Sequence, residues 1–236
     1  MAFQHGKDTQ VLVGQYDLSA YFTNADIDSS QASHDVTTFS KDTVQRSAGL
    51  RDGKVSIAGL FDAAASVILS GYLGSANGEP LSVVPDGGTA GGQAAIGLVR
   101  HVSFKTSAPV GGMVTLAAAL EATGAWEPNG VVLHTLHAET VTGNETTVHD
   151  VTAATLNGGV ATIHCTAFTG TSLAVKVQHS TNGTDWLDLS PTFTTLTGVG
   201  SEQILVAAGT TVNQYLRAAY TIVGTTMTFF VAFARK

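Results

Sequence analysis

The chain has 236 residues, of which 44% are hydrophobic and only 12% are charged. This length suits one large domain or two small ones, and the apolar content is sufficient for a core in each. The net charge of −7 and the lack of any cluster of lysine or arginine exclude a protein that grips nucleic acid by its phosphates. A charged fraction about half that of an ordinary soluble domain indicates a subunit covered in an assembly, or a β protein whose surface carries hydroxyl groups.

Disulfides and membrane spans are also excluded by the sequence. The single cysteine, Cys165, cannot form an intramolecular disulfide, and its strand-like neighbours predict a small core side chain. The N-terminus has no basic segment followed by an apolar stretch, so we expect no signal peptide. Because no apolar run approaches the ~20 residues that span a bilayer, we expect a soluble protein made in a cytoplasm, with no membrane partner.

A candidate strand at residues 9–13 opens the chain, and a long polar loop is predicted to follow at residues 16–33. The loop is too rich in Asp, Asn and Ser to be a buried strand. It nevertheless keeps large apolar side chains, which indicates that they are buried against some surface. The candidate contact residues of this loop are Tyr16, Asp17, Leu18, Tyr21, Phe22, Asp26 and Asp28.

The next segment predicts a strand at residues 34–39, a tight turn at 49–53 and a second strand at 54–62. In the second strand Val55, Ile57 and Gly59 alternate with other residues, so one face can lie on a core. The residues of this strand and turn motif are His34, Asp35, Val36, Thr37, Phe39, Gly49, Asp52 and Gly53.

A single α-helix is predicted at residues 62–73, where Asp62 can cap the N-terminus and Gly74 can end the last turn. Apolar residues recur there at intervals of three and four, the spacing of one helical face. The residues of the predicted packed face are Ala64, Ala65, Ile68, Leu69 and Tyr72.

Strands follow at 81–84, 94–106 and 110–122, the last two as a hairpin. The glycine-rich residues 85–92 lack the Lys-Ser/Thr of a P-loop and lead into a strand, so they predict a plain loop rather than a nucleotide site. The candidates for the buried face of the hairpin are Val99, Phe104, Leu116 and Leu120.

Proline and glycine at residues 126–130 predict a domain boundary, which divides the chain into 1–125 and 126–236. The second part has no helical pattern, and its regularly spaced strands predict a β-sandwich or small barrel. These strands are predicted at 131–138, 146–151, 160–168, 173–179, 203–207, 212–223 and 227–234.

No catalytic or cofactor motif is present, so we predict a protein that is not an enzyme and that uses no cofactor. His134 and His137 could bind zinc, but residues three apart on a strand point to opposite faces, and no carboxylate stands at a useful spacing; no metal site is predicted. Asp26 and Asp28 lack the glycine and glutamate of a calcium loop. Trp186 beside a polar turn leaves a sugar-binding module open as an alternative.

The segments YDLSAYF, a polar loop, HDVTTFSKD, GLRDGKVSIAGLFD and a short helix are similar in order to tail tube (major tail) proteins of long-tailed bacteriophages, most clearly over residues 10–125. The resemblance implies a structural virion protein whose stacked rings form the tail tube for DNA ejection. Four strands of each subunit would join those of its neighbours in one barrel, and residues 16–33 would reach the next ring.

The resemblance also implies further properties of the assembly. The partners would be other copies of the chain and the tape measure, terminator and distal tail proteins. DNA would pass through the lumen without specific binding. The location would be the phage tail, after synthesis in the host cytoplasm. A carbohydrate-binding or host-adhesion β-sandwich of a tail or capsid is the alternative function.

Short sequence echoes leave the ring architecture open. The sequence HDVT at residues 34–37 recurs at 149–152, and SANG at 75–78 is matched by STNG at 180–183. A true duplication predicts two tube-type domains and a three-chain ring of pseudo-sixfold symmetry. Accidental matches predict six chains and a second domain that decorates the tube. Because a helix is predicted only in the first part, the six-chain ring is favoured.

Overall fold

The structure of the protein is a computed structural model that describes residues 6–236, and it is mainly β, as predicted. Residues 1–5 lie outside the described residues. The thirteen strands of residues 6–236 are connected through one antiparallel hydrogen-bonded network. Within residues 6–236 no helix combines the length and the apolar character needed to cross a membrane.

The elements of the first half are the 3-10 helices η1 (Gly6–Asp8) and η2 (Ser19–Tyr21), the helix α1 (Ala63–Tyr72), and the strands β1 (Gln10–Val13), β2 (Tyr16–Asp17), β3 (Phe22–Asp35), β4 (Arg46–Leu60), β5 (Glu79–Val84), β6 (Gln93–Ser107) and β7 (Thr115–Glu139). The strands of the second half are β8 (Gly143–Asn144), β9 (His149–Asp150), β10 (Gly159–Ser180), β11 (Leu187–Asp188), β12 (Gly200–Val206) and β13 (Tyr215–Arg235).

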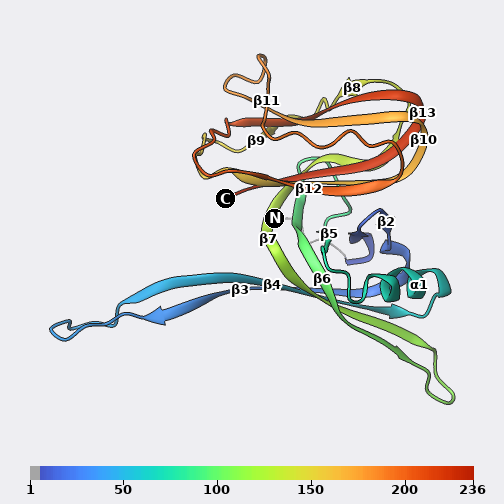
Figure 1. Cartoon of the computed structure of the whole chain (residues 1–236), viewed down its shortest axis with the longest axis horizontal. Coiled ribbons are helices and arrows are strands. Elements are labelled where there is room, and N and C mark those ends of the chain that lie inside the picture. The colour runs from blue at the N-terminus through green and yellow to red at the C-terminus, as the bar shows by residue number, and fades with distance from the viewer. Residues whose placement is uncertain (1–5) are drawn as a thin grey trace.

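Strand β7 connects the two halves of the molecule. Its first part pairs with β4 and β6, and its last part pairs with β13. Figure 1 shows the result: a lower sheet of β3, β4, β6 and β7 with α1 beside it, and an upper body in which β10 and β13 bend back over themselves. The strand order is β11-β10-β13-β7-β6-β5-β1-β2, with β4 and β3 added beside β7.

The helix forms where the sequence predicts it. The Asp62 side chain accepts hydrogen bonds from the backbone N–H groups of Ala64 and Ala65, which satisfies two donors that the helix itself leaves free. Ala65 and Leu69 are buried in the first core, and Ile68 and Tyr72 pack against it. Ala64 is exposed, so this member of the predicted packed face was assigned wrongly.

The long loop predicted at residues 16–33 is wrong. The segment forms β2, η2 and β3, and β3 pairs with β4 over almost its whole length. The prediction equated polar sequence with loop, but a strand needs apolar residues only where a core covers it. Most of β3 is exposed on both faces, so Asp, Asn and Ser are compatible with it.

The tight turn predicted at residues 49–53 is also wrong, because these residues lie inside β4 and the hairpin tip is at residues 36–45. The glycines serve close packing instead. A Cβ atom at Gly53 would lie 2.5 Å from the Trp126 ring, and one at Gly49 would lie 2.8 Å from Nε2 of His34. Neither glycine has a positive φ angle, so neither is required for a turn.

The strand interruption predicted at residues 126–130 does not occur, since β7 runs through them. Pro128 is accommodated because the register shifts between the pairs Ile96 with Glu127 and Ala94 with Gly130, which leaves an extra residue on β7. Such a bulge tolerates a residue without a backbone N–H.

The buried side chains nevertheless divide near this point. One core cluster, here called the first core, contains only residues up to Trp126, and a second core contains only residues from Val131 onward. A third cluster joins them, with Leu12 and Ile96 from the first half and Phe230 and Ala232 from the second. The division of the chain into domains 1–125 and 126–236 stays a prediction, and the two cores favour it.

The second half contains longer strands than predicted. The strands expected at 160–168 and 173–179 are one element, β10, and those expected at 212–223 and 227–234 are one element, β13. Both bend sharply in Figure 1, and Gly170 of β10 pairs with Gly224 of β13. A Cβ at Gly170 would lie 2.7 Å from the Cα of Gly224, so only glycine permits this contact. The bend folds one strand pair into two layers around the second core.

The remaining predicted elements vary in outcome. Strands β5, β6 and β12 and the glycine-rich loop are confirmed, whereas the strand predicted at 146–151 forms only as the short β9. Cys165 is buried in the second core, as predicted. The echoed HDVT sequences both end a strand, where Asp35 and Asp150 accept hydrogen bonds from the N–H groups of Thr37 and Thr152. The echo therefore reflects a shared turn chemistry.

Candidate assembly surface and histidine-glutamate cluster

The lower sheet has one covered and one open face. Val55 and Ile57 of β4 and Leu116 and Leu120 of β7 point into the first core and are fully or almost fully buried. Their neighbours alternate to the other face, because successive strand residues point in opposite directions. No other part of the described chain packs on that open face, and it therefore offers a candidate assembly surface.

The open face carries small and balanced side chains. Strand pairing aligns Asp28, Lys54, Glu121 and Arg100 in one row across β3, β4, β7 and β6. The Nζ atom of Lys54 lies 3.3 Å from Oε1 of Glu121. Further rows contain the residues Asp26, Ser56, Ala119 and Ser103, and Asn24, Ala58, Ala117 and Lys105. These three rows thus contain three acidic and three basic side chains, with alanine and serine between them.

Both outer edges of the lower sheet are open within residues 6–236. Strand β3 pairs only with β4, and the end of β6 beyond Arg100 pairs only with β7, apart from a bridge between Leu73 and His101. A groove of about 550 Å³ runs beside the start of β3, lined in part by Phe22, Asn24 and Ala25. Free backbone donors and acceptors at such edges pair readily with another strand.

The ends of β3 and β4 form a projecting arm, residues 30–51, that leaves the body of the molecule (Figure 1). Its base is held to β7, where the Trp126 indole N–H donates to Oγ of Ser29 at 2.8 Å and Arg51 lies 3.1 Å from Glu127. Beyond this base the arm is exposed, including the Phe39 ring, which has 102% relative exposure. The other exposed apolar side chains of the arm are Val36, Val44 and Leu50.

The apolar residues predicted to contact a neighbouring ring lie in the chain's own core instead. Leu18 is fully buried, and Tyr16, Tyr21 and Phe22 pack against the first core. The segment that projects is the arm, which contains His34, Val36 and Phe39 of the predicted strand and turn motif. Sequence reasoning therefore found the right region but assigned the projecting role to the wrong half of it.

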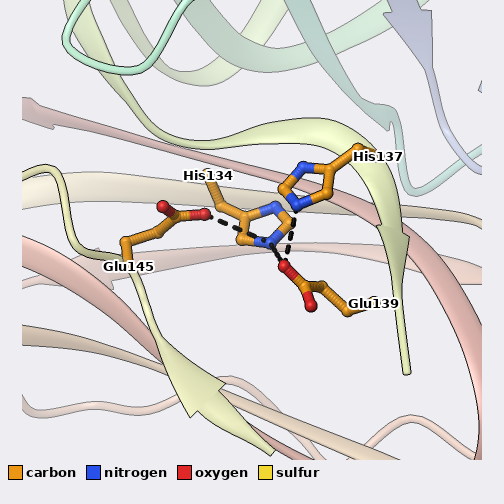
Figure 2. A group of neighbouring side chains, drawn as sticks. All are labelled: His134, His137, Glu139 and Glu145. Atoms are coloured by element: carbon orange, nitrogen blue, oxygen red, sulfur yellow. Dashed lines mark hydrogen bonds and ion pairs between the residues drawn. The ribbon is translucent and has the colours of Figure 1, made fainter. Parts of the chain in front are cut away.

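The structure places His134 and His137 beside two glutamates, although no carboxylate was expected at a useful spacing from them. His134, His137 and Glu139 of β7 meet Glu145, which follows β8, and one ligand atom from each lies within 4.8 Å of the others (Figure 2). Oε1 of Glu139 lies 2.7 Å from Nε2 of His137 and 3.7 Å from Nε2 of His134. Oε1 of Glu145 lies 3.4 Å from Nε2 of His134.

The argument that His134 and His137 must point to opposite faces is wrong for this strand. His137 pairs with Phe229 and His134 with Val231, so these two pairs are three residues apart on β7 but only two residues apart on β13. The extra residue is a β-bulge, which returns the two histidines to one face, where their rings stack with centroids 4.5 Å apart. A period of two in the sequence cannot reveal a bulge, and Glu145 reaches the site only through tertiary folding.

Burial decides the charge state of this cluster. It lowers the pKa of His134 to about 4, so the ring is neutral at pH 7, although the nearby Glu139 favours the charged form. Burial also raises the pKa of Glu145. Burial opposes ionisation of Glu139 as well, but hydrogen bonds from Tyr220 and His137 outweigh it and leave the pKa of Glu139 below its usual value.

The two tryptophans offer little surface to a sugar. Trp126 is 5% exposed and lies between Gly53, Gly97 and the first core. The Trp186 ring has the Arg217 guanidinium 4.2 Å from its centroid, which occupies one of its faces. No observation on these residues favours the adhesion alternative.

No protein-family model and no curated protein sequence matches the chain. Among solved structures, a chain from the virion of a native gene transfer agent particle matches with a TM-score of 0.44 and 22% sequence identity, covering 53% of this chain and 98% of that one. The SPP1 Dit (gp 19.1) protein matches with a TM-score of 0.36 and 12% sequence identity, covering 96% of this chain and 99% of that one. A chain of the phage p2 baseplate, in its activated conformation with Sr, matches with a TM-score of 0.37 and 7% sequence identity, covering 97% of this chain and 98% of that one. None of the three is described as a tail tube protein.

Proposed function

We propose that the protein is a structural virion subunit that assembles into stacked rings, and that these rings form the tube of a phage tail through which DNA is ejected. The observation that carries the proposal is the lower sheet, with one face on the first core, one open face and two open edges. A chain that stayed monomeric would expose both sheet edges to uncontrolled pairing with other strands. A closed ring removes every such edge.

Ring closure follows from where the open edges lie. The free edge of β3 and the free end of β6 are on opposite sides of the four-stranded sheet, so β3 of one copy can pair with β6 of the next. This contact is heterologous, and a constant rotation between copies closes it into a ring. The open faces of β3, β4, β7 and β6 then line the lumen.

The chemistry of the open face suits a conduit. The three acidic and three basic side chains of its three rows, together with alanine and serine, give DNA no continuous basic track. We therefore expect no measurable binding to duplex DNA at physiological salt. Salt-sensitive binding at low protein concentration would contradict this assignment of the face.

The remaining parts have complementary roles in the proposed assembly. The arm contacts the adjacent ring, because it projects from the sheet and carries exposed apolar residues. The helix α1 covers the first core, and residues 126–236, all of them described, contain no helix. Six chains per ring, with the second half decorating the outside, therefore remain the favoured architecture over three duplicated chains. The expected partners in the virion are other tail proteins.

The test is the assembly state of the purified full chain. Negative-stain electron microscopy should show rings or tubes with a central hole, and mass photometry should give a ring mass that distinguishes six copies from three. A strictly monomeric mass at high concentration under several salt conditions would refute the proposal. Truncation after Ala125 is a poor substitute, because it cuts β7 and removes Trp126 from the first core.

A further inference from the structure

The histidine-glutamate cluster has the donor set of a metal centre, and it plays no part in the proposed ring. His134, His137, Glu139 and Glu145 offer two imidazole nitrogens and two carboxylate groups. Zinc accepts both ligand types in four-coordinate sites, whereas calcium and magnesium prefer oxygen alone. We propose that these four residues form a site for a divalent transition-metal ion, with zinc as the ion that fits the set.

The hydrogen bonds of the two histidines point their metal-binding atoms toward the cluster. Nδ1 of His134 lies 3.1 Å from the carbonyl oxygen of Phe229, and Nδ1 of His137 lies 3.0 Å from that of Thr135. A carbonyl accepts hydrogen bonds, so Nδ1 of His134 carries the proton and its Nε2 keeps its lone pair. Nε2 of His137 donates to Oε1 of Glu139 at 2.7 Å and would release this proton to bind the ion. Backbone partners of this kind orient the histidine ligands of zinc in proteins.

The Nε2 atom of His134 is the second, independent observation. Its side chain is completely buried, and this nitrogen has no hydrogen-bond partner in the structure. The lone pair instead faces oxygen atoms of Glu139 and Glu145, at 3.7 and 3.4 Å. The buried nitrogen and the two carboxylate oxygens repel one another unless a proton or a metal cation lies between them.

A proton on His134 is the competing explanation, because it would turn these contacts into ion pairs. Full burial of the His134 side chain argues against it, because an imidazolium there loses its hydration. A neutral His134 ring has one proton and cannot donate both to the carboxylates and to the carbonyl of Phe229. A proton on Nε2 would leave the Nδ1 lone pair against that carbonyl. A metal ion satisfies Nε2 and both carboxylates while Nδ1 keeps its donor role.

The geometry requires only a small contraction. Zinc bonds of about 2.0–2.2 Å place tetrahedral ligands about 3.4 Å apart. The four ligand atoms already lie within 4.8 Å of one another. The His137 side chain is 44% exposed and provides the route of entry, while Glu139 and Glu145 are 19% and 14% exposed. The bound ion would join β7 to the segment after β8, and so would close one end of the second half.

Zinc titration of the tag-free full chain tests the proposal. Competition with a chromophoric chelator should give one zinc per chain, and magnesium or calcium at millimolar concentration should not displace it. H137Q and E145Q should each raise the zinc dissociation constant at least tenfold. The matched control is H34Q, which removes another exposed histidine, from the arm, and should leave the constant unchanged. No stoichiometric uptake, or uptake that both site variants leave unaltered, would overturn the proposal.

A spectroscopic measurement on the unaltered chain keeps the test independent of how the variants fold. Cobalt in place of zinc should give the intense visible absorption of a four- or five-coordinate site with nitrogen ligands, and zinc should displace it. A weak, octahedral-type spectrum that persists in H137Q would show adventitious surface binding and would refute the site. Because the cluster lies outside the lower sheet, the metal titration and the ring assay test independent proposals, and either can be refuted without the other.

Discussion

The two halves of the molecule use long antiparallel strands in opposite ways. In the second half β10 and β13 bend where Gly170 meets Gly224, and the two resulting layers enclose their own core. In the first half β3, β4, β6 and β7 run past the first core and leave a face, two edges and two hairpin tips exposed. The second half therefore encloses its own core, whereas the first half leaves surfaces that other chains could cover.

The difference concerns where apolar side chains end up. Phe229 and Phe233 of β13 are fully buried, but Phe39 at the arm tip and Val110 at the tip of the β6–β7 hairpin are fully exposed. Apolar side chains presented singly at projecting tips gain nothing within one chain. A comparison of substitutions at buried and projecting positions therefore separates stability from assembly.

The largest effect on stability is expected from F233A. Phe233 is fully buried in the second core, and its removal leaves a cavity that should lower the free energy of unfolding by about 3–5 kcal/mol. V110A, the exposed counterpart, should change it by less than about 0.5 kcal/mol. Urea unfolding of both variants measures the contrast. Equal effects would mean that the β6–β7 tip is covered in the soluble protein.

Acidification should weaken the junction between the halves. His164 of β10 is fully buried, with Nδ1 2.7 Å from the carbonyl oxygen of Gly14 and Nε2 2.8 Å from Oγ of Ser82. Burial lowers its pKa to about 4 from 6.5. The unfolded chain therefore binds a proton between pH 6.5 and 4 that the folded chain does not, so stability is complete above pH 6.5 and falls as the pH decreases through this window.

The size of this pH effect follows from the shift. It amounts to roughly 3 kcal/mol for His164 alone. H164Q should be less stable at pH 7 because the two hydrogen bonds are disturbed, but its unfolding free energy should depend less steeply on pH between 6.5 and 4. Urea unfolding at several pH values gives both slopes. An unchanged slope in H164Q would show that other groups carry the acid sensitivity.

A smaller effect is expected at the helix cap of the first half. D62A removes the acceptor for the N–H groups of Ala64 and Ala65 and should cost about 1 kcal/mol. D62N keeps a capping oxygen and should recover most of this loss. Thermal unfolding of the two variants decides the point, and equal midpoints for D62A and the unaltered chain would show that packing alone holds α1.

The sequence contained enough information for the fold class, the helix and most strand positions. Asp62 and Gly74 bracket the helix, and the alternation of Val55 and Ile57 identified the buried face of β4 correctly. These features depend on local chemistry and on the period of the pattern. The two cores also divide close to the predicted boundary at residues 126–130, although β7 continues through it.

The failures have one physical cause, since each depends on contacts distant in sequence. Most of β3 was predicted as a loop because a strand exposed on both faces has no apolar alternation. Gly53 was assigned to a turn because its partner, Trp126, is far along the chain. The His134–His137 cluster was rejected because a bulge changes which residues share a face. The proposed ring contacts lie between chains. Within a single chain they are visible only as the unpaired edges of β3 and β6.

The smallest effect on stability, and the largest on assembly, is expected from shortening the arm. Replacing residues 32–50 by Asn-Gly connects Gln31 to Arg51, which already face each other across β3 and β4, through a two-residue turn suited to a hairpin. The contacts of Trp126 with Ser29 and of Arg51 with Glu127 are retained. The removed residues are nearly all exposed, so the free energy of unfolding should change by less than about 0.5 kcal/mol.

The shortened chain should still close into rings, since the edges of β3 and β6 remain, but the rings should not stack into tubes. Electron microscopy and sedimentation measure the two steps separately. F39S serves as the matched control, because it keeps the arm and removes only its fully exposed ring; a partial loss of stacking would assign part of the contact energy to that residue. Deletion of residues 17–30 cannot replace this experiment, because it removes the buried Leu18. Tubes that grow at the normal rate from the shortened chain would show that the arm does not connect the rings, and the contrast between a self-contained second half and an assembly-dependent first half would then rest on the sheet edges alone.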